Sequence, residues 1–338
     1  MLNRQWVLAR RPTGHICPDD FAYQEEAFEP APLKPGEILL KSRVFRFAPA
    51  MRTWIKATSQ FVPPMPLDRP VTGSCSAEVL ASENPAYPVG AIVSAMTGWQ
   101  DYAVVDPAKL RTPPRIKPAG VSIEDFESLL GGNSLTAYFG LLRIGEPKPG
   151  ETVLVSGAAG STGAMAAQIG KIVGCKVVGI AGGRDKCDWL VEACGLDAAI
   201  DYKAENVERR LGELCPEGVN VFFDNVGGAI LDAAIEHMAP FGRVALCGQI
   251  GSYDEGDALA AGPRNMMRVI YWRLKLQGFL MFDFADETAQ AEADLRRWSE
   301  EGRLMHKVDL HHGFDQLPAT FMRLFDGSNF GTLLLTND

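Results

Sequence analysis

The chain has 338 residues, of which 46% are hydrophobic and 22% charged, so a large core and about two domains are expected. Its formal net charge of −9 argues against a surface that binds nucleic acid or an anionic membrane. No apolar run approaches the roughly 18 residues that a membrane span needs. The first residues turn charged too early for a secretory signal, which predicts a cytoplasmic protein.

The first third of the chain is rich in proline and in alternating apolar residues. The alternation predicts strands over residues 37–45, 76–82 and 91–105, joined by proline and glycine turns. Proline clusters such as that of residues 62–70 keep helices short or absent. This part of the chain therefore predicts an antiparallel barrel or sandwich.

Near residue 124 the pattern changes to alternating helices and strands. Residues 124–145 predict helical segments that break at Gly131 and Gly132, and residues 152–156 predict a short buried strand. The elements expected next are a helix ending at Gly174, a strand over 176–180, a helix over 185–195, and apolar runs at 198–202, 220–226, 243–250 and 275–282. A helix over about 287–300 then leads to the segment 306–314, a short helix and a last strand over 330–336. This α/β rhythm is typical of a doubly wound parallel sheet.

Three glycines follow the predicted strand 152–156 and open the next helix. Gly157 permits a tight turn, Gly160 lets a diphosphate approach the backbone, and Gly163 lets the helix lie close to the sheet. Exposed N–H groups and the positive end of the helix dipole then suit phosphate groups. The spacing predicts a dinucleotide site; the alternative is a glycine turn without a ligand.

The end of the second strand discriminates between the two nicotinamide dinucleotides. An NAD site usually offers a carboxylate there to bind the ribose diol. This chain has small residues, including Gly182, and then Arg184 and Lys186, whose cations suit a 2′-phosphate. We therefore predict NADPH. Asp185 leaves an NAD diol as the alternative, and Lys186 could also be a solvated lysine at the start of a helix.

Several segments together resemble one protein family over nearly the whole chain. They include TGWQDYAVV (97–105), GETVLVSGAAGSTG (150–163), VFFDNVGG (221–228), ALCGQIGSY (245–253) and SNFGTLLL (328–335). The chain resembles the zinc-independent, NADPH-dependent branch of the medium-chain dehydrogenase/reductase superfamily, near the prostaglandin reductases, alkenal double-bond reductases and curcumin reductase-like enzymes. The resemblance implies a GroES-like β-barrel catalytic domain of residues 1–125, completed by 305–338, and a Rossmann NADP-binding domain of residues 126–304. It also implies a homodimer.

The resemblance further implies which residues bind the cofactor. Ser161 and its neighbours would contact the diphosphate, Lys186 and Tyr202 the 2′-phosphate, and residues 279–281 the nicotinamide. The full predicted set is Gly157, Ala159, Gly160, Ser161, Thr162, Gly163, Gly182, Lys186, Tyr202, Asn225, Cys247, Gly248, Ile250, Ser252, Tyr253, Phe279, Leu280, Met281 and Asn329. The alternatives are that Phe279 and Met281 are core residues, that Asn225 caps a turn, and that Tyr202 is a surface residue.

A catalytic metal is not expected. Where zinc alcohol dehydrogenases carry a Gly-His-Glu segment, residues 72–79 contain no histidine. His311 and His312 are adjacent, so a strand would point them to opposite faces. The seven cysteines lack C-x-x-C spacing, which predicts reduced thiols rather than a zinc knuckle or disulfides.

Without a metal, reduction of a C=C bond polarised by a carbonyl is the predicted reaction. Hydride would go to the β-carbon, and a donor would stabilise the enolate oxygen. Tyr253 is the predicted catalytic residue, as that donor or as the source of the α-carbon proton; the alternative is that it only packs on the cofactor. The rival functions are an NADPH:quinone oxidoreductase and a non-catalytic NADPH-binding interaction protein.

Two segments depart from the family pattern. Residues 46–52 read RFAPAMR, with Ala48 and Ala50 in place of an acid and a tyrosine. Gly132 and Asn133 stand where relatives carry a methionine and a proline. Both changes predict a roomier pocket, suited to a bulky or aromatic enone.

Overall fold

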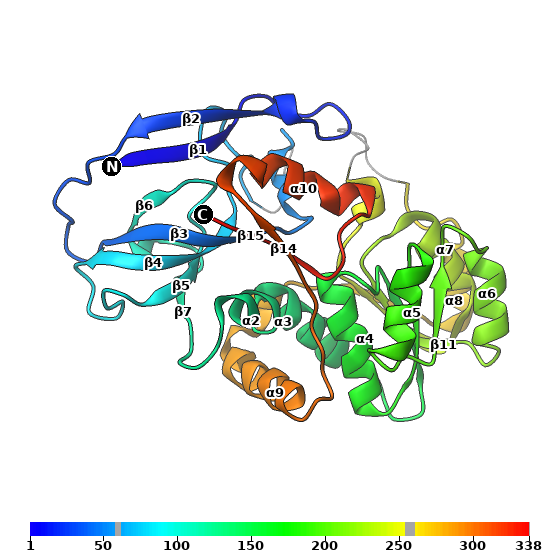
Figure 1. Cartoon of the computed structure of the whole chain (residues 1–338). Helices are drawn as coiled ribbons and strands as arrows, with labels where there is room; N and C mark the ends of the chain where they lie inside the picture. The colour runs from blue at the N-terminus through cyan, green and yellow to red at the C-terminus, as the bar shows by residue number, and fades with distance from the viewer. Residues whose placement is uncertain (58–61, 254–260, 338) are drawn as a thin grey trace. The chain divides into compact units, whose positions relative to one another are not determined.

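The computed structural model of the chain describes residues 1–57, 62–253 and 261–337. The described residues form two compact units, one of residues 1–127 and 308–337 and the other of residues 128–253 and 261–307 (Figure 1). Within the described ranges, no helix is both long enough and apolar enough to cross a membrane.

The first unit is built mainly on antiparallel strands, with one parallel pair between β14 and β15. A seven-stranded sheet runs in the order β14-β15-β3-β4-β5-β7, with β6 paired to β3, and β1 pairs with β2 in a separate hairpin (Figure 1). Its strands are β1 (Leu2–Leu8), β2 (Phe21–Ala27), β3 (Ile38–Arg46), β4 (Ser74–Ser82), β5 (Ile92–Ala95), β6 (Tyr102–Val105), β7 (Arg115–Ile116), β14 (Val308–His312) and β15 (Thr332–Thr336). The helices are α1 (Met51–Ile55), α2 (Ile123–Ser128) and α10 (Leu317–Asp326).

Alternating residues of the first unit's sheet meet α10 in one core. Ile38 and Leu40 of β3 are fully buried, and Phe321 of α10 packs edge-on against Trp99, also fully buried. The strand predicted over 91–105 is wrong in its extent, since the chain turns between β5 and β6. Gly98 makes this turn with a φ of +74°, a conformation that residues with a side chain rarely adopt.

The second unit is a six-stranded parallel sheet with helical connections. Its strand order is β10-β9-β8-β11-β12-β13. The chain moves outward from β8 through β9 to β10 and then crosses to β11, so the switch in direction lies between β8 and β11. The strands are β8 (Thr152–Ser156), β9 (Lys176–Ala181), β10 (Ala198–Asp201), β11 (Val219–Asp224), β12 (Met238–Leu246) and β13 (Lys275–Gly278).

The helices between successive strands of this sheet connect them and pack on it, whereas the first and the last helix of the unit pack on other helices (Figure 1). The helices of the unit are α3 (Gly132–Phe139), which continues into the π-helical turn η3 (Gly140–Gly145), α4 (Ser161–Val173), α5 (Arg184–Glu192), α6 (Val207–Leu214), α7 (Gly228–Glu236), α8 (Met266–Trp272) and α9 (Thr288–Glu300). Short 3₁₀ turns follow β12 at η4 (Ile250–Ser252) and β13 at η5 (Met281–Glu287).

Two predicted apolar runs extend beyond the strands that they contain. Strand β12 ends at Leu246 and β13 at Gly278, although the runs continue to residues 250 and 282. An apolar run does not mark where a strand ends, because the residues after it can be apolar for another reason. The Phe279 ring, for instance, packs against Phe223 of β11, with ring centroids 6.3 Å apart.

Candidate dinucleotide site

The turn after β8 packs so closely against the start of α4 that position 163 accepts only glycine. Gly157 has a φ of +59°, and its carbonyl accepts a 3.0 Å hydrogen bond from the Gly160 N–H. A Cβ at Gly163 would lie 2.2 Å from the Gly157 oxygen. The first turn of α4 therefore rests directly on the Gly157 backbone, as the predicted dinucleotide fingerprint requires.

The amino end of α4 is partly open to solvent. Gly160 is the N-cap, and Ser161 and Thr162 are half-buried in the first turn, whereas Ala159 is buried beneath it. The unpaired N–H groups of a helix start and its dipole favour an anion there. The side chain of Asn133, from α3, donates a 3.1 Å hydrogen bond from Nδ2 to the Ser161 Oγ.

The structure brings Gly182 and Tyr202 together at the ends of β9 and β10. A Cβ at Gly182 would lie 2.8–2.9 Å from the Tyr202 ring and hydroxyl, so a side chain at 182 would displace that ring. The Tyr202 N–H donates a 3.1 Å hydrogen bond to the Ala181 carbonyl, and the residue remains 45% exposed. These two residues form a partly exposed surface next to the amino end of α5.

Lys186 lies in the first turn of α5 and is half-buried. Arg184 begins the same helix, lies 3.4 Å from Asp188 and has a side chain 89% exposed, so its predicted contact with a 2′-phosphate stays a prediction. In the turn before α5, the Asp201 carboxylate at the end of β10 accepts a 2.8 Å hydrogen bond from the Gly183 N–H. Lys186 is thus the partly buried cation of the α5 start.

The buried carboxylate of Asp224, which sequence reasoning missed, lies at the end of β11, the strand next to β8 at the switch point. Asp224 is fully buried and accepts hydrogen bonds from the Ser156 hydroxyl and from the Val226 and Gly227 N–H groups. Burial raises the pKa of Asp224, while these bonds act to lower it. An aspartate directly after the apolar run VFF is the signal that could have revealed it, since a carboxylate is rarely buried without partners.

Asn225 lies at the same strand end and connects it to β8. Its Nδ2 donates to the Ser156 carbonyl at 2.7 Å, and its N–H donates to the Ser156 Oγ at 2.8 Å. The N–H groups of Cys247 and Gly248 donate to the Asp224 carbonyl, and that of Ile250 to the Asn225 carbonyl. These bonds bring Asn225, Cys247, Gly248 and Ile250 together at the carboxyl ends of β11 and β12, and their contacts with a cofactor stay predictions.

Tyr253 follows η4 and directs its hydroxyl back to this loop. The hydroxyl oxygen accepts a 3.3 Å hydrogen bond from the Gln249 N–H, an arrangement that leaves its proton available for donation. Burial raises the pKa of Tyr253 above 10, so the phenol stays protonated at neutral pH. Burial also raises the pKa of the Cys247 thiol to about 12, which keeps it uncharged.

The segment after β13 has one packed and one exposed residue. A Cβ at Gly140 would lie 2.1 Å from the Phe279 ring, so this ring fills the space beside η3. Leu280 is 40% exposed and Met281 half-buried. Asn329 lies between α10 and β15 of the first unit, and its predicted contact with the cofactor stays a prediction.

Over residues 1–57, 62–253 and 261–337, no three His, Cys, Asp or Glu side chains are grouped so that they could hold a metal ion. The His311 ring contacts Asp309, and the His312 ring contacts Thr336 on the neighbouring strand.

Two family models match the chain. The one described as the N-terminal domain of oxidoreductase matches residues 4–112, and the one described as zinc-binding dehydrogenase matches residues 161–297.

Curated relatives match over nearly full length. The chain is 37% identical to prostaglandin reductase 1 of Bos taurus, over 98% of both chains. It is 33% identical to the NADPH-dependent curcumin reductase of Escherichia coli (strain K12), over 98% of this chain and 96% of the relative. CurA from Vibrio vulnificus, solved in complex with NADPH, is 34% identical with a TM-score of 0.92 over 99% of each chain. The chain therefore belongs to the medium-chain dehydrogenase/reductase superfamily, in its zinc-independent branch of prostaglandin, alkenal and curcumin reductases.

Proposed function

We propose that this protein is an NADPH-dependent reductase that saturates the C=C bond of α,β-unsaturated ketones and aldehydes. Relatives named as an NADPH-dependent curcumin reductase and an NADP⁺-dependent 2-alkenal reductase support the reaction class. The observation that carries the proposal is the glycine turn below α4, where Gly163 must lack a side chain. When bound, NADPH supplies the hydride.

The residues present fit the two anionic parts of this cofactor. The amino end of α4, with Ser161 and Thr162, would bind the diphosphate. Gly182, Tyr202 and Lys186 would bind the 2′-phosphate, with the lysine as the cation. The end of β9 carries glycines where an NAD site places a carboxylate, which supports the phosphorylated dinucleotide.

Tyr253 would act as the donor to the substrate. Its hydroxyl is protonated at neutral pH, as in an ordinary tyrosine, and burial raises its pKa further. Its oxygen already accepts a hydrogen bond from the Gln249 N–H. A hydrogen bond donated to the substrate oxygen would stabilise the negative charge that develops there. Transfer of one proton to the α-carbon, from Tyr253 or from water, balances the added hydride.

A panel of acceptors tests the reaction. We expect NADPH absorbance to fall with an aryl enone and with a small alkenal, faster with the aryl enone, and the product to be the saturated carbonyl. Faster turnover of a quinone than of any enone would favour the quinone oxidoreductase instead. Binding of NADPH without oxidation by any acceptor would favour the non-catalytic alternative.

The cofactor preference is tested by Lys186→Ala. Loss of a charge-assisted bond to phosphate should raise the Kd for NADPH roughly 10- to 100-fold, with little change in the Kd for NADH. Lys148→Ala, which removes an exposed lysine from the segment before β8, is the matched control. Equal effects of Lys186→Ala on both dinucleotides would contradict a 2′-phosphate contact.

We also propose that the protein is a homodimer that pairs through the second unit. Strand β13 is the last strand of its sheet, and Phe241, Met267, Ile270 and Tyr271 are 50–65% exposed beside it. Exposed apolar side chains near a free strand edge favour pairing with another chain. Light scattering should show a dimer for the wild type and a monomer for Ile270→Glu; a wild-type monomer would contradict the proposal.

The cytoplasmic location stays a prediction.

A further inference from the structure

Asn133 contacts the candidate diphosphate site from a helix outside the glycine turn. Its Nδ2 donates a 3.1 Å hydrogen bond to the Oγ of Ser161, the first residue of α4. Both residues are half-buried, so the pair faces the same partly open edge as the amino end of α4. The two helices also pack on each other along their lengths.

The first turn of α3 is fixed, which makes the position of Asn133 well defined. The Ser134 hydroxyl, fully buried, donates to the Ser128 carbonyl at 2.6 Å, and the Thr136 hydroxyl donates to the Gly132 carbonyl at 2.7 Å. Leu135 and Phe139 anchor the helix in the core. Asn133 therefore reaches Ser161 from a rigid support rather than from a mobile loop.

The direction of this hydrogen bond determines what Ser161 can do next. A serine hydroxyl has one proton to donate and two lone pairs that accept. When Asn133 donates to a lone pair, the proton of Ser161 is directed to another acceptor, and the bond it makes becomes stronger through polarisation. At the amino end of α4 the favoured acceptor is an anionic oxygen.

We infer that Asn133 is a positioning residue of the cofactor site, which orients the Ser161 hydroxyl to donate to a diphosphate oxygen of NADPH. The inference rests on the proposed function, since it requires that this dinucleotide binds here. An alanine or a proline at 133 could not donate this hydrogen bond to Ser161.

Titration of NADPH by calorimetry tests the inference without reliance on turnover. Asn133→Ala should raise the Kd about 3- to 10-fold, the effect of one lost hydrogen bond. Ser161→Ala should have an effect of similar size. The double variant should bind no worse than Ser161→Ala alone, because Asn133 acts only through that hydroxyl. Asn84→Ala, which removes a turn asparagine of the first unit, should leave the Kd unchanged.

Asn133→Asp tests the direction of the bond. A carboxylate would accept the Ser161 proton and add negative charge, so the Kd should rise more than in Asn133→Ala. Binding of adenosine 2′-monophosphate, which lacks the diphosphate, should be unaffected in every variant. Additive effects in the double variant, or tolerance of Asn133→Asp, would overturn the inference. A wild type that binds adenosine 2′-monophosphate but not NADPH, or neither, would instead overturn the proposed function.

Discussion

At the scale of residues, the geometry of the candidate site depends on the space beside two glycines and on the protonation of Tyr253. Gly163 has no room for a methyl group because the Gly157 backbone lies against it, whereas a methyl group at Gly182 would have to displace the Tyr202 ring. Tyr253 is half-buried, and burial raises its pKa further above the range in which it would lose its proton at neutral pH. The features of Gly163 and Tyr253 each lead to a prediction about one substitution.

Gly163→Ala should destabilise the second unit and weaken cofactor binding together. The added methyl would clash with the Gly157 carbonyl oxygen, so α4 must move away from β8. Such overpacking costs about 1–3 kcal/mol of unfolding free energy. Chemical denaturation and NADPH titration would measure the two effects. Gly14→Ala is the control, since its methyl would meet no atom within 4 Å.

Tyr253→Phe should lower kcat for an enone by about 100-fold, the usual contribution of a positioned proton donor. A quinone acceptor needs no carbon protonation and should be affected much less. Because the pKa of Tyr253 is raised above 10, wild-type kcat should not lose this donor up to about pH 9. A higher KM with unchanged kcat would show that Tyr253 only packs on the cofactor.

At the scale of elements, buried polar bonds align the strand ends of the second unit. Ser156 at the end of β8 and Asp224 at the end of β11 share a 2.8 Å hydrogen bond, and the Asp224 carbonyl holds the segment after β12. The loops that carry Asn225, Cys247 and Gly248 are therefore fixed relative to the glycine turn. This arrangement is a support for the site rather than part of its chemistry.

Asp224→Ala should destabilise the second unit more than a typical substitution. It leaves the Ser156 hydroxyl and the Val226 and Gly227 N–H groups buried without this acceptor. Each unmet donor costs about 1–3 kcal/mol of unfolding free energy. Urea denaturation would measure the loss. Asp232→Ala, whose carboxylate lies near the surface, is the comparison and should cost far less.

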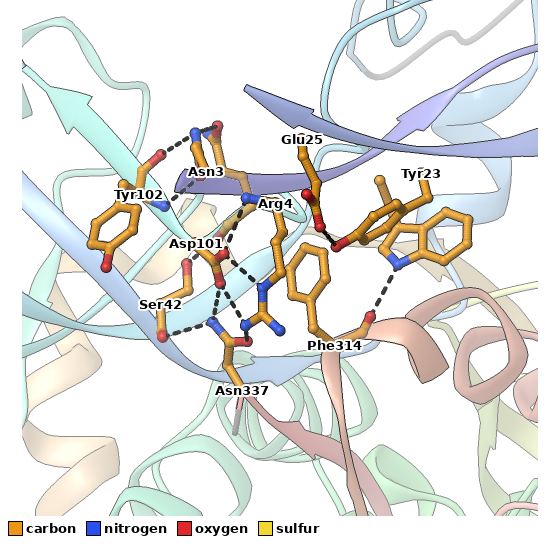
Figure 2. Close-up of polar contacts among 11 residues, drawn as sticks. Asn3, Arg4, Tyr23, Glu25, Ser42, Asp101, Tyr102, Phe314 and Asn337 are labelled. Atoms are coloured by element: carbon orange, nitrogen blue, oxygen red, sulfur yellow. Dashed lines mark hydrogen bonds and ion pairs between the residues drawn. The ribbon is translucent and has the colours of Figure 1, made fainter. Parts of the chain in front are cut away.

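At the scale of the whole molecule, a polar cluster joins distant parts of the chain within the first unit. The Arg4 guanidinium binds the Asp101 carboxylate at 2.8 and 3.0 Å, and the Asn337 side chain donates to that carboxylate at 2.8 Å and to the Ser42 carbonyl at 3.1 Å (Figure 2). The guanidinium also lies 4.8 Å from the centre of the Phe314 ring. Strands β1 and β3 and the segment after β15 are thus held at one point.

Asp101→Asn should destabilise the first unit at neutral pH and less so in acid. Burial acts to raise the pKa of Asp101, but hydrogen bonds from Arg4 and Asn337 outweigh it and lower the pKa below 3.8. A lowered pKa means that the stabilisation is present above pH 3.8 and is lost as the pH falls through the folded value.

The expected cost of Asp101→Asn at pH 7 is on the order of 2 kcal/mol, limited by the partial exposure of Arg4. Urea denaturation from pH 7 to pH 3 would measure it. Asp19→Asn, whose side chain is 85% exposed, should change stability by far less at every pH. A difference for Asp101→Asn that is independent of pH would contradict the assignment.

The sequence by itself determined the parts of this protein that depend on neighbouring residues. The alternation of strands and helices from residue 124 onward follows from local periodicity, and the glycine turn from steric limits within a few positions. Tertiary structure alone decided the contacts between segments far apart in the chain. The hairpin of β1 and β2, the Ser156–Asp224 bond, the Asn133–Ser161 bond and the packing of Phe279 on Gly140 are of this kind. No local pattern encodes them, because each side chain acquires its partner only when the sheet has brought distant strand ends together.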